Sequence, residues 1–256
     1  MFQSQIYRLL HNNLSRFMFI LILIIPCVEV FQLLLMKFQT GTDFHPAFAF
    51  FLAGSSRGHL AQILLLWFLP LFFLLLGSDD VIQDYRTGYR DILISKVGRK
   101  KYCLQKYIVS FSVSFITMFF SLLVNFLLVS VFFANGTYTK GLSQIELPNN
   151  SLFTMSVAHP YLADLSFALI ACIFAGFAGL IGASVSLFFL DKKYAYTAAF
   201  FIWFLLVLKE NSLMFLFQPF AEYGFNVLIP ILLLALAVFT IVPFIIFIYE
   251  VRYNES

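Results

Sequence analysis

The stretch that decides the fold is residues 165–190, which read LSFALIACIFAGFAGLIGASVSLFFL. It contains no charged side chain, and its only hydroxyls are serines. A helix needs about 20 predominantly apolar residues to cross the roughly 30 Å hydrocarbon core of a bilayer. The stretch exceeds that length, so it predicts a transmembrane helix.

Five further apolar stretches have a similar character: residues 17–36, 60–77, 107–134, 194–208 and 225–249. Hydrophobic residues make up 61% of the 256-residue chain and charged residues 11%, where about 25% is usual in soluble domains. This composition excludes a soluble fold and a disordered chain, and three cysteines in a chain of this size exclude a disulfide scaffold. We expect an all-α integral membrane protein, a single transmembrane domain over residues 1–256, with six spans between residues 17 and 249.

Basic residues indicate the orientation. Twelve Lys and Arg residues fall in the N-terminal segment, the loops after spans two and four and the C-terminus, against four on the other side. The positive-inside rule places both termini in the cytoplasm, and the net charge of +3 then calls for no nucleic-acid partner. No small-residue cleavage motif follows the first apolar stretch, so we expect a retained helix. Residues 1–16 have apolar residues at helical spacing and predict an interfacial helix, or else an extension of the first span.

Motifs for catalysis, nucleotide binding and metal binding are missing from the sequence. There is no G-x-x-x-x-G-K-[ST] loop, no H-E-x-x-H and no G-x-S-x-G, and the four histidines are scattered. We therefore expect no enzyme activity, bound cofactor or metal site in this chain. In the fourth span, small residues recur every four positions: Ala171, Ala175, Gly179 and Ala183. Such a stripe lets two helices approach closely, within the subunit or between subunits.

One acidic residue, Glu29, lies well inside a span. Twelve residues after position 17, it stands about 18 Å along the helix axis, in the outer half of the membrane. Intramembrane carboxylates are costly and often functional, so Glu29 is a candidate for lining a transport pathway. The alternative is a hydrated carboxylate near the outer mouth, bonded to a polar neighbour.

The predicted cytoplasmic loop, residues 78–106, holds seven of the 16 basic and four of the 13 acidic residues. It reads SDDVIQDYRTGYRDILISKVGRKKYCLQK, with acidic residues first, a glycine break, a short amphipathic stretch and then a basic cluster. A short helix with an apolar face and charged ends suits docking to a soluble partner. A solvated loop that only enforces topology is the alternative.

This loop resembles the segment between the second and third helices of ABC-2 type permeases, the membrane subunits of ATP-binding-cassette exporters. The matching features are Asp80 or Asp84, Gly88, Ile92-Leu93-Ile94-Ser95, Gly98-Arg99 and Lys106. The sequence departs from the pattern where Arg86 and Thr87 precede Gly88, since many members have Glu directly before the glycine, and where Lys96-Val97 replaces a frequent Pro-Val.

The resemblance implies a complex of two six-helix subunits, either identical or different, with two cytoplasmic ATPase subunits that bind ATP and Mg²⁺. It implies a short extracellular segment, residues 209–224, that dips back into the membrane between the fifth and sixth spans. It also implies contacts that couple the permease to the ATPase. By position these fall on Asp84, Tyr85, Arg86, Thr87, Gly88, Arg90 and Arg99, with Asp191 and Lys192 as a second contact.

The cargo is less well indicated. The chain has 35 phenylalanines, and spans crowded with them suit an amphipathic or hydrophobic molecule such as a peptide, an antimicrobial or a lipid. Alternatively, the phenylalanines reflect lipid-facing surface and codon bias. Short members of the family often export or resist antimicrobial peptides in Gram-positive bacteria, which places this chain in a bacterial plasma membrane. A secondary transporter, a channel, or an immunity or sensor protein without an ATPase are the alternative functions.

Overall fold

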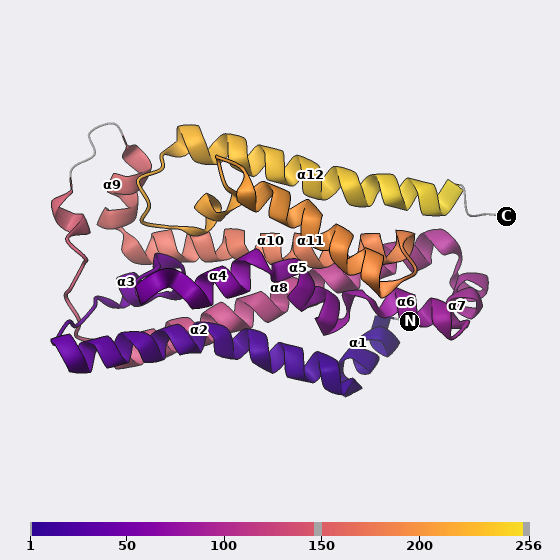
Figure 1. The fold of residues 1–256 in the computed structure, drawn as a ribbon, viewed down its shortest axis with the longest axis horizontal. Helices are drawn as coiled ribbons and strands as arrows, with labels where there is room; N and C mark the ends of the chain where they lie inside the picture. Colours follow the sequence, from indigo (N-terminus) through magenta and orange to yellow (C-terminus); the bar gives the residue numbers. More distant parts are fainter. Residues whose placement is uncertain (1, 146–149, 253–256) are drawn as a thin grey trace.

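The computed structural model describes residues 2–145 and 150–252, and all regular structure in these residues is helical apart from one isolated bridge between Phe44 and Tyr138. Four long helices run along the length of the molecule (Figure 1): α2 (Asn13–Thr40), α8 (Arg99–Phe132), α10 (Pro160–Phe188) and α12 (Phe225–Arg252). Each is long and apolar enough to cross a membrane. The coarse expectation of an all-helical, membrane-type chain is therefore confirmed for the described residues.

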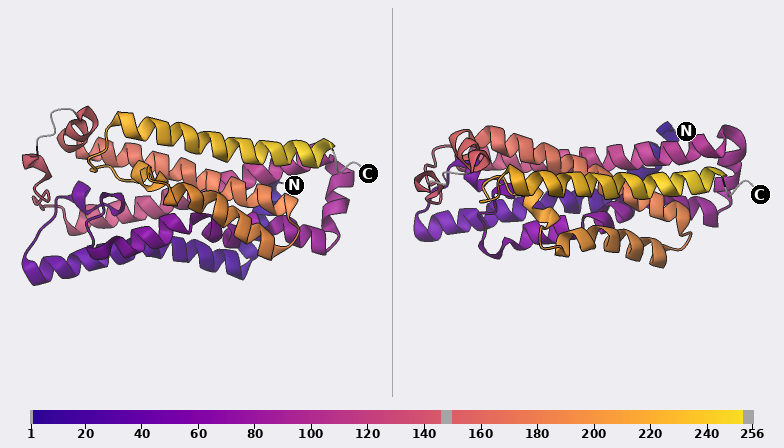
Figure 2. Two further views of the ribbon diagram at one scale, coloured as in Figure 1. Left: turned by 45° about the horizontal axis from the view of Figure 1, so that its top comes forward. Right: turned by 90° about the horizontal axis from the view of Figure 1, so that it is seen from above.

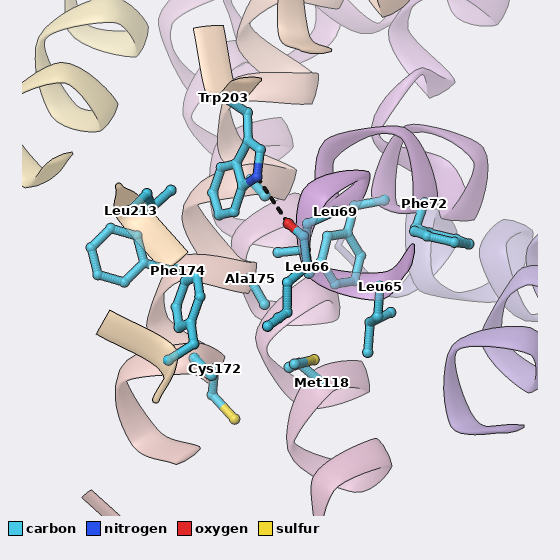
Figure 3. Packing of buried hydrophobic residues seen from close by; sticks show 14 of the residues in the cluster. Leu65, Leu66, Leu69, Phe72, Met118, Cys172, Phe174, Ala175, Trp203 and Leu213 are labelled. Atoms are coloured by element: carbon cyan, nitrogen blue, oxygen red, sulfur yellow. Dashed lines mark hydrogen bonds between the residues drawn. The ribbon is translucent and has the colours of Figure 1, made fainter. Parts of the chain in front are cut away.

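The second predicted span is broken. It forms α4 (Leu60–Trp67), α5 (Leu69–Phe73) and a π-helical turn, η3 (Leu74–Ser78), with a bend of 63° that allows at most one crossing. Pro70 lies at the start of α5, and its ring prevents the helix from continuing through it. In Figure 3 the indole of Trp203 reaches the carbonyl oxygen of Leu66 at this bend.

The fifth predicted stretch forms α11 (Lys192–Leu208), which has 17 residues and is shorter than the four long helices. After it comes a 3-10 turn, η5 (Leu213–Phe217), in which Leu213, Leu216 and Phe217 are buried. Among the described residues, four helices thus have the length of a span, or five if the bent pair crosses as one span.

Helix α10 lies at the centre of the bundle. It packs against α8, α12, α11 and α5 (Figure 2). The small residues of its stripe allow this, because Ala171, Ala175 and Ala183 are buried and a Cβ on Gly179 would lie only 2.8 Å from the carbonyl oxygen of Ser110 in α8. The stripe contacts a helix of the same chain.

The two ends of the bundle differ (Figure 1). One end, called here the hairpin end, holds α1 (Phe2–His11), α6 (Asp80–Arg86), α7 (Tyr89–Val97) and the last turns of α12. The other, the loop end, holds the short elements α3 (Pro46–Ala49), η1 (Phe51–Ala53), η2 (Arg57–His59), η4 (Leu142–Gln144) and α9 (Ser151–Ala158). The first described helix, α1, and the C-terminal turns of the last, α12, therefore lie at the same end of the bundle.

Two boundaries differ from the expectation. The predicted interfacial helix 1–16 stops at His11, because Asn12 adopts an extended conformation and caps α2 by accepting a hydrogen bond from the Leu14 amide. The predicted loop 78–106 is shorter than expected, because α8 begins at Arg99 after Gly98 breaks the chain. The basic cluster before the third span is therefore helical.

The segment between the first and second predicted spans is largely buried. Every residue of positions 46–52 is inaccessible, and the run passes between α2, α8 and α10. The amide of Phe51 donates to Oδ1 of Asn125 in α8, whose Nδ2 donates to the carbonyl oxygen of Pro26 in α2. This apolar segment fills the loop end of the bundle.

Candidate functional site

The hairpin end carries a pair of short helices that project from the bundle. Helix α6 ends at Arg86, Gly88 adopts a left-handed conformation with φ of 70°, and α7 starts at Tyr89. A left-handed residue reverses the chain at little cost only when it is glycine, so Gly88 allows the hairpin to form. The apex, residues 85–89, is exposed at every position.

The acidic residues of α6 point the other way, into the bundle. The Asp84 side chain is fully buried and forms ion pairs with Arg8 of α1 at 2.7 Å and with Lys106 of α8 at 2.9 Å. Asp80 lies beside the same two cations, 2.9 Å from Arg8 and 3.7 Å from Lys106. The hydroxyl of Tyr102 adds a hydrogen bond to Asp84 at 3.2 Å. This cluster holds α6 onto α1 and α8.

The pKa values of Asp84 and Asp80 are shifted in opposite directions. Burial pushes the pKa of Asp84 upward, but Lys106 and Arg8 outweigh it and hold that pKa below its ordinary value. Burial raises the pKa of Asp80 above its ordinary value, since Lys106 and Arg8 offset it only in part and Asp84 adds repulsion. Asp84 is thus the anion that the two cations stabilise most.

Two more ion pairs tie this region to α11 and α12. Arg90, the second residue of α7, lies 2.7 Å from Glu250 near the end of α12, and both side chains are buried. Asp79, just before α6, pairs with Lys192 at 2.7 Å and accepts a hydrogen bond from the hydroxyl of Tyr196, both in α11. The hairpin is therefore joined by charge to α1, α8, α11 and α12.

The residues predicted to couple this chain to an ATPase divide into two groups. Tyr85, Arg86, Thr87 and Gly88 are exposed at the apex, and Arg99 is half-buried at the start of α8. Asp84 and Arg90 face inward, so their side chains hold the hairpin in place and cannot touch a docked partner directly. At the second predicted contact, Asp191 caps α11 by accepting from the Lys193 amide, and Lys192 is exposed except for its ion pair.

Glu29 is completely buried in α2. One carboxylate oxygen accepts a hydrogen bond of 3.3 Å from the Ser56 amide, and the other has no hydrogen-bond partner in the described part of the chain. Glu29 therefore lies behind the segment between η1 and η2 and is not exposed on a cavity wall.

Several residues of this site were missed in sequence. Arg8, Tyr102 and Glu250 are separated by many residues from the side chains that they contact, and only the fold brings them together. The four-residue spacing of Asp80 and Asp84, which puts both on one face of a helix, was the available signal. Asp164, buried near the start of α10, was also missed.

No group of three or more His, Cys, Asp or Glu side chains that could hold a metal ion occurs within residues 2–145 and 150–252. The arrangement at the hairpin end is one of ion pairs and an exposed apex. Its geometry suits docking and mechanical connection.

Together, the helical bundle, its apolar spans and the charged hairpin define a chain compatible with a multi-helix membrane protein. Over 254 residues the sequence is 59% identical to "Uncharacterized protein YybM" of Bacillus subtilis (strain 168), an alignment covering 99% of this chain and 100% of that protein. The chain therefore belongs to the YybM family. No family model matches the sequence, and no solved structure matches it.

Proposed function

We propose that this chain is the membrane-spanning subunit of an ABC-2 type exporter, which moves an amphipathic or hydrophobic cargo outward with ATP hydrolysed by a separate subunit. Two such permease subunits and two ATPase subunits form the complex, and ATP with Mg²⁺ binds the ATPase. The complex lies in a bacterial plasma membrane with the hairpin end in the cytoplasm.

The observation that carries the proposal is the α6–α7 hairpin. Its apex offers exposed Tyr85, Arg86 and Thr87, while its base is fixed by ion pairs to four other helices. A segment that only enforced topology through its charges would need neither a folded hairpin nor buried partners. A rigid projection so connected is suited to receive a displacement at the apex and pass it to the spans.

Buried ion pairs make the connection stiff. Asp84 and Arg90 lie on the two arms of the hairpin, and each bonds to a different long helix at 2.9 Å or less. Charge-assisted hydrogen bonds of this length are directional and resist separation in surroundings from which water is excluded. In the proposed cycle, ATP-driven movement of the docked subunit turns α8 and α12 together.

The six-span topology is part of the proposal. Helices α2, α8, α10 and α12 supply four spans, the bent α4–α5 pair the second, and the short α11 the fifth. Segment 209–224 is then the extracellular re-entrant segment, and the burial of Leu213, Leu216 and Phe217 supports this assignment. Backbone at membrane depth that is not part of a span must be covered by protein, as these residues are.

A cavity at the loop end supports an amphipathic cargo. It encloses about 510 Å³ between α4, the end of α11 and η5. Its wall combines polar Gln62 and Gln218 with aromatic Trp67 and Phe215. Mixed walls of this kind suit molecules that have both an apolar body and polar groups. Glu29 stays the pathway candidate, and it reaches this cavity only if the segment carrying Ser56 moves.

The decisive experiment places a photo-reactive amino acid at Thr87 in the full-length chain, expressed in its native host. We expect a cross-link to an ATP-binding protein from Thr87 and none from the same amino acid at Tyr138, which is exposed at the loop end. Recovery of no ATP-binding protein, or equal recovery from both positions, would contradict the proposal.

A backbone variant tests the connection itself. Proline at Gly88 is incompatible with φ of 70°, so Gly88→Pro should abolish stimulation of ATP hydrolysis by cargo while the protein still inserts into the membrane. The matched control is Gly141→Pro, since Gly141 has φ of 74° but lies at the loop end. Coupled transport by Gly88→Pro would contradict the proposal that the hairpin couples ATP hydrolysis to transport.

A further inference from the structure

A second cavity lies at the loop end, between α8 and α10. It is open to the outside of the bundle, where Leu165 and Leu169 are exposed, and its volume is about 370 Å³. That volume is within the range of about 300–1,000 Å³ that is common for small-molecule sites. Residues 119–126 of α8 and 161–172 of α10 form most of its wall, and Phe50 closes it from the buried outer segment. The wall is almost wholly apolar, so it excludes strongly hydrated ligands.

The exception in this wall is Asp164. Its side chain is only 2% exposed, and neither carboxylate oxygen has a hydrogen-bond partner among the residues that the structure describes. Burying a carboxylate without a partner is costly, and buried polar groups in proteins are almost always paired. Because Asp164 lines the cavity, a ligand in the cavity would supply the missing partner.

Four aromatic rings line the same cavity, those of Phe50, Phe119, Phe126 and Tyr161. Phe126 contacts Tyr161 edge-on with ring centroids 6.4 Å apart, and Phe50 edge-on at 6.1 Å. The face of an aromatic ring attracts a cation, and groups of such rings are used to bind ammonium centres that cannot donate hydrogen bonds. A carboxylate beside aromatic rings in an apolar wall is therefore complementary to one ligand chemistry, a positive charge on an apolar body.

We propose that this cavity binds a hydrophobic organic cation, with its positive centre between Asp164 and the rings of Phe126 and Tyr161. The proposal goes beyond the exporter assignment and stands without it, because binding needs no ATPase partner. A lipid acyl chain is the competing occupant, and it would be indifferent to the charge of residue 164.

The probe is radiolabelled tetraphenylphosphonium, measured on the full-length protein in phosphatidylcholine nanodiscs against empty nanodiscs. We expect saturable binding, and we expect Asp164→Asn to weaken it about tenfold or more because an ionic partner is lost. Glu222→Gln, which neutralises an exposed carboxylate outside this cavity, should leave binding unchanged. The anion tetraphenylborate, of similar shape and measured by itself in place of the cation, should not bind saturably.

Equal affinity of wild type and Asp164→Asn for tetraphenylphosphonium, or saturable binding of tetraphenylborate with similar affinity, would overturn the proposal and leave an apolar groove for lipid chains. A measurement on the wild-type protein covers the case in which the variant does not fold. Dicyclohexylcarbodiimide modifies buried carboxyl groups, so tetraphenylphosphonium should slow modification of Asp164, mapped by mass spectrometry, while leaving Glu29 unaffected. Failure to protect Asp164 would also overturn the proposal.

Discussion

The indole Nε1 of Trp203 donates a hydrogen bond of 3.0 Å to the main-chain carbonyl oxygen of Leu66. Leu66 lies four residues before Pro70, whose nitrogen carries no hydrogen, so this carbonyl cannot accept the usual helical bond. Unpaired backbone groups are costly in apolar surroundings. Trp203, buried in α11, thus supplies the donor that the bend between α4 and α5 lacks.

Trp203→Phe keeps an aromatic ring in the core but removes the donor. We expect a loss of about 1 kcal/mol in the free energy of unfolding, the usual scale for side-chain hydrogen bonds between membrane helices. Reversible unfolding in mixed micelles, followed by circular dichroism, would measure it. In a Pro70→Ala background, the new backbone amide at position 70 can donate to Leu66, so the same substitution should cost less. Equal losses in both backgrounds would show that the bond does not compensate for the proline.

Gly179→Ala tests the close approach of α10 and α8. Alanine normally stabilises a helix by about 1 kcal/mol over glycine. Here the added Cβ would lie 2.8 Å from the Ser110 carbonyl oxygen and would clash with the Ser114 side chain. We expect the opposite sign, a destabilisation of about 2 kcal/mol, since overpacking in a close-packed contact is costly. A higher melting temperature for the variant would contradict the contact.

The membrane class and most helix positions could be predicted, because a helix that crosses the bilayer needs an apolar run long enough to span it, and such runs are visible in the sequence. The bend at Pro70 was not predicted, although the proline was visible, since sequence does not show which neighbour will supply a replacement donor. The same applies at Pro26, where the hydroxyl of Ser121 donates to the carbonyl oxygen of Ile22 at 2.7 Å. Such pairings depend on contacts between distant helices.

The site was predicted only by region. The sequence indicated the charged region, residues 78–106, but it could not distinguish Asp84, which faces inward, from exposed Arg86 two residues later. That distinction depends on Arg8 and Lys106, which lie in other helices. The burial of positions 46–52 was not predicted, because this apolar run is too short to be recognised as a span and nothing else in the sequence marks it as buried.

Acid should weaken the cluster around Asp84. Because its pKa lies below the ordinary value, about 3.9 in an unfolded chain, its contribution is complete above that value and is lost as pH falls through the folded pKa. The raised pKa of Asp80 has the opposite sign, so protonating Asp80 relieves a cost as pH falls. We expect Asp84→Asn to cost about 2 kcal/mol at pH 7.

The difference in stability between wild type and Asp84→Asn should then narrow as the pH is lowered below about 4. The unfolded chain binds the proton there first, and the folded state follows as the pH passes its lower pKa. Thermal unfolding in detergent at a series of pH values would follow it. Asp91→Asn, an exposed change in α7, is the control and should leave the pH profile as it is. If the difference in stability between wild type and Asp84→Asn stays constant down to about pH 3, the ionisation of Asp84 does not contribute to stability.

The buried pair of Arg90 and Glu250 connects α7 to α12, and its two members can be tested against each other. Arg90→Met removes the guanidinium that lies 2.7 Å from Glu250 and should cost about 3 kcal/mol, because removing one member of a buried ion pair is strongly destabilising. The double variant Arg90→Met with Glu250→Met removes both charges, so it should recover most of that loss. Additive losses in a double-mutant cycle would show that the residues do not interact.

If the double variant is stable but no longer stimulates ATP hydrolysis with cargo, the pair transmits movement; if coupling survives, α12 follows the hairpin through other contacts.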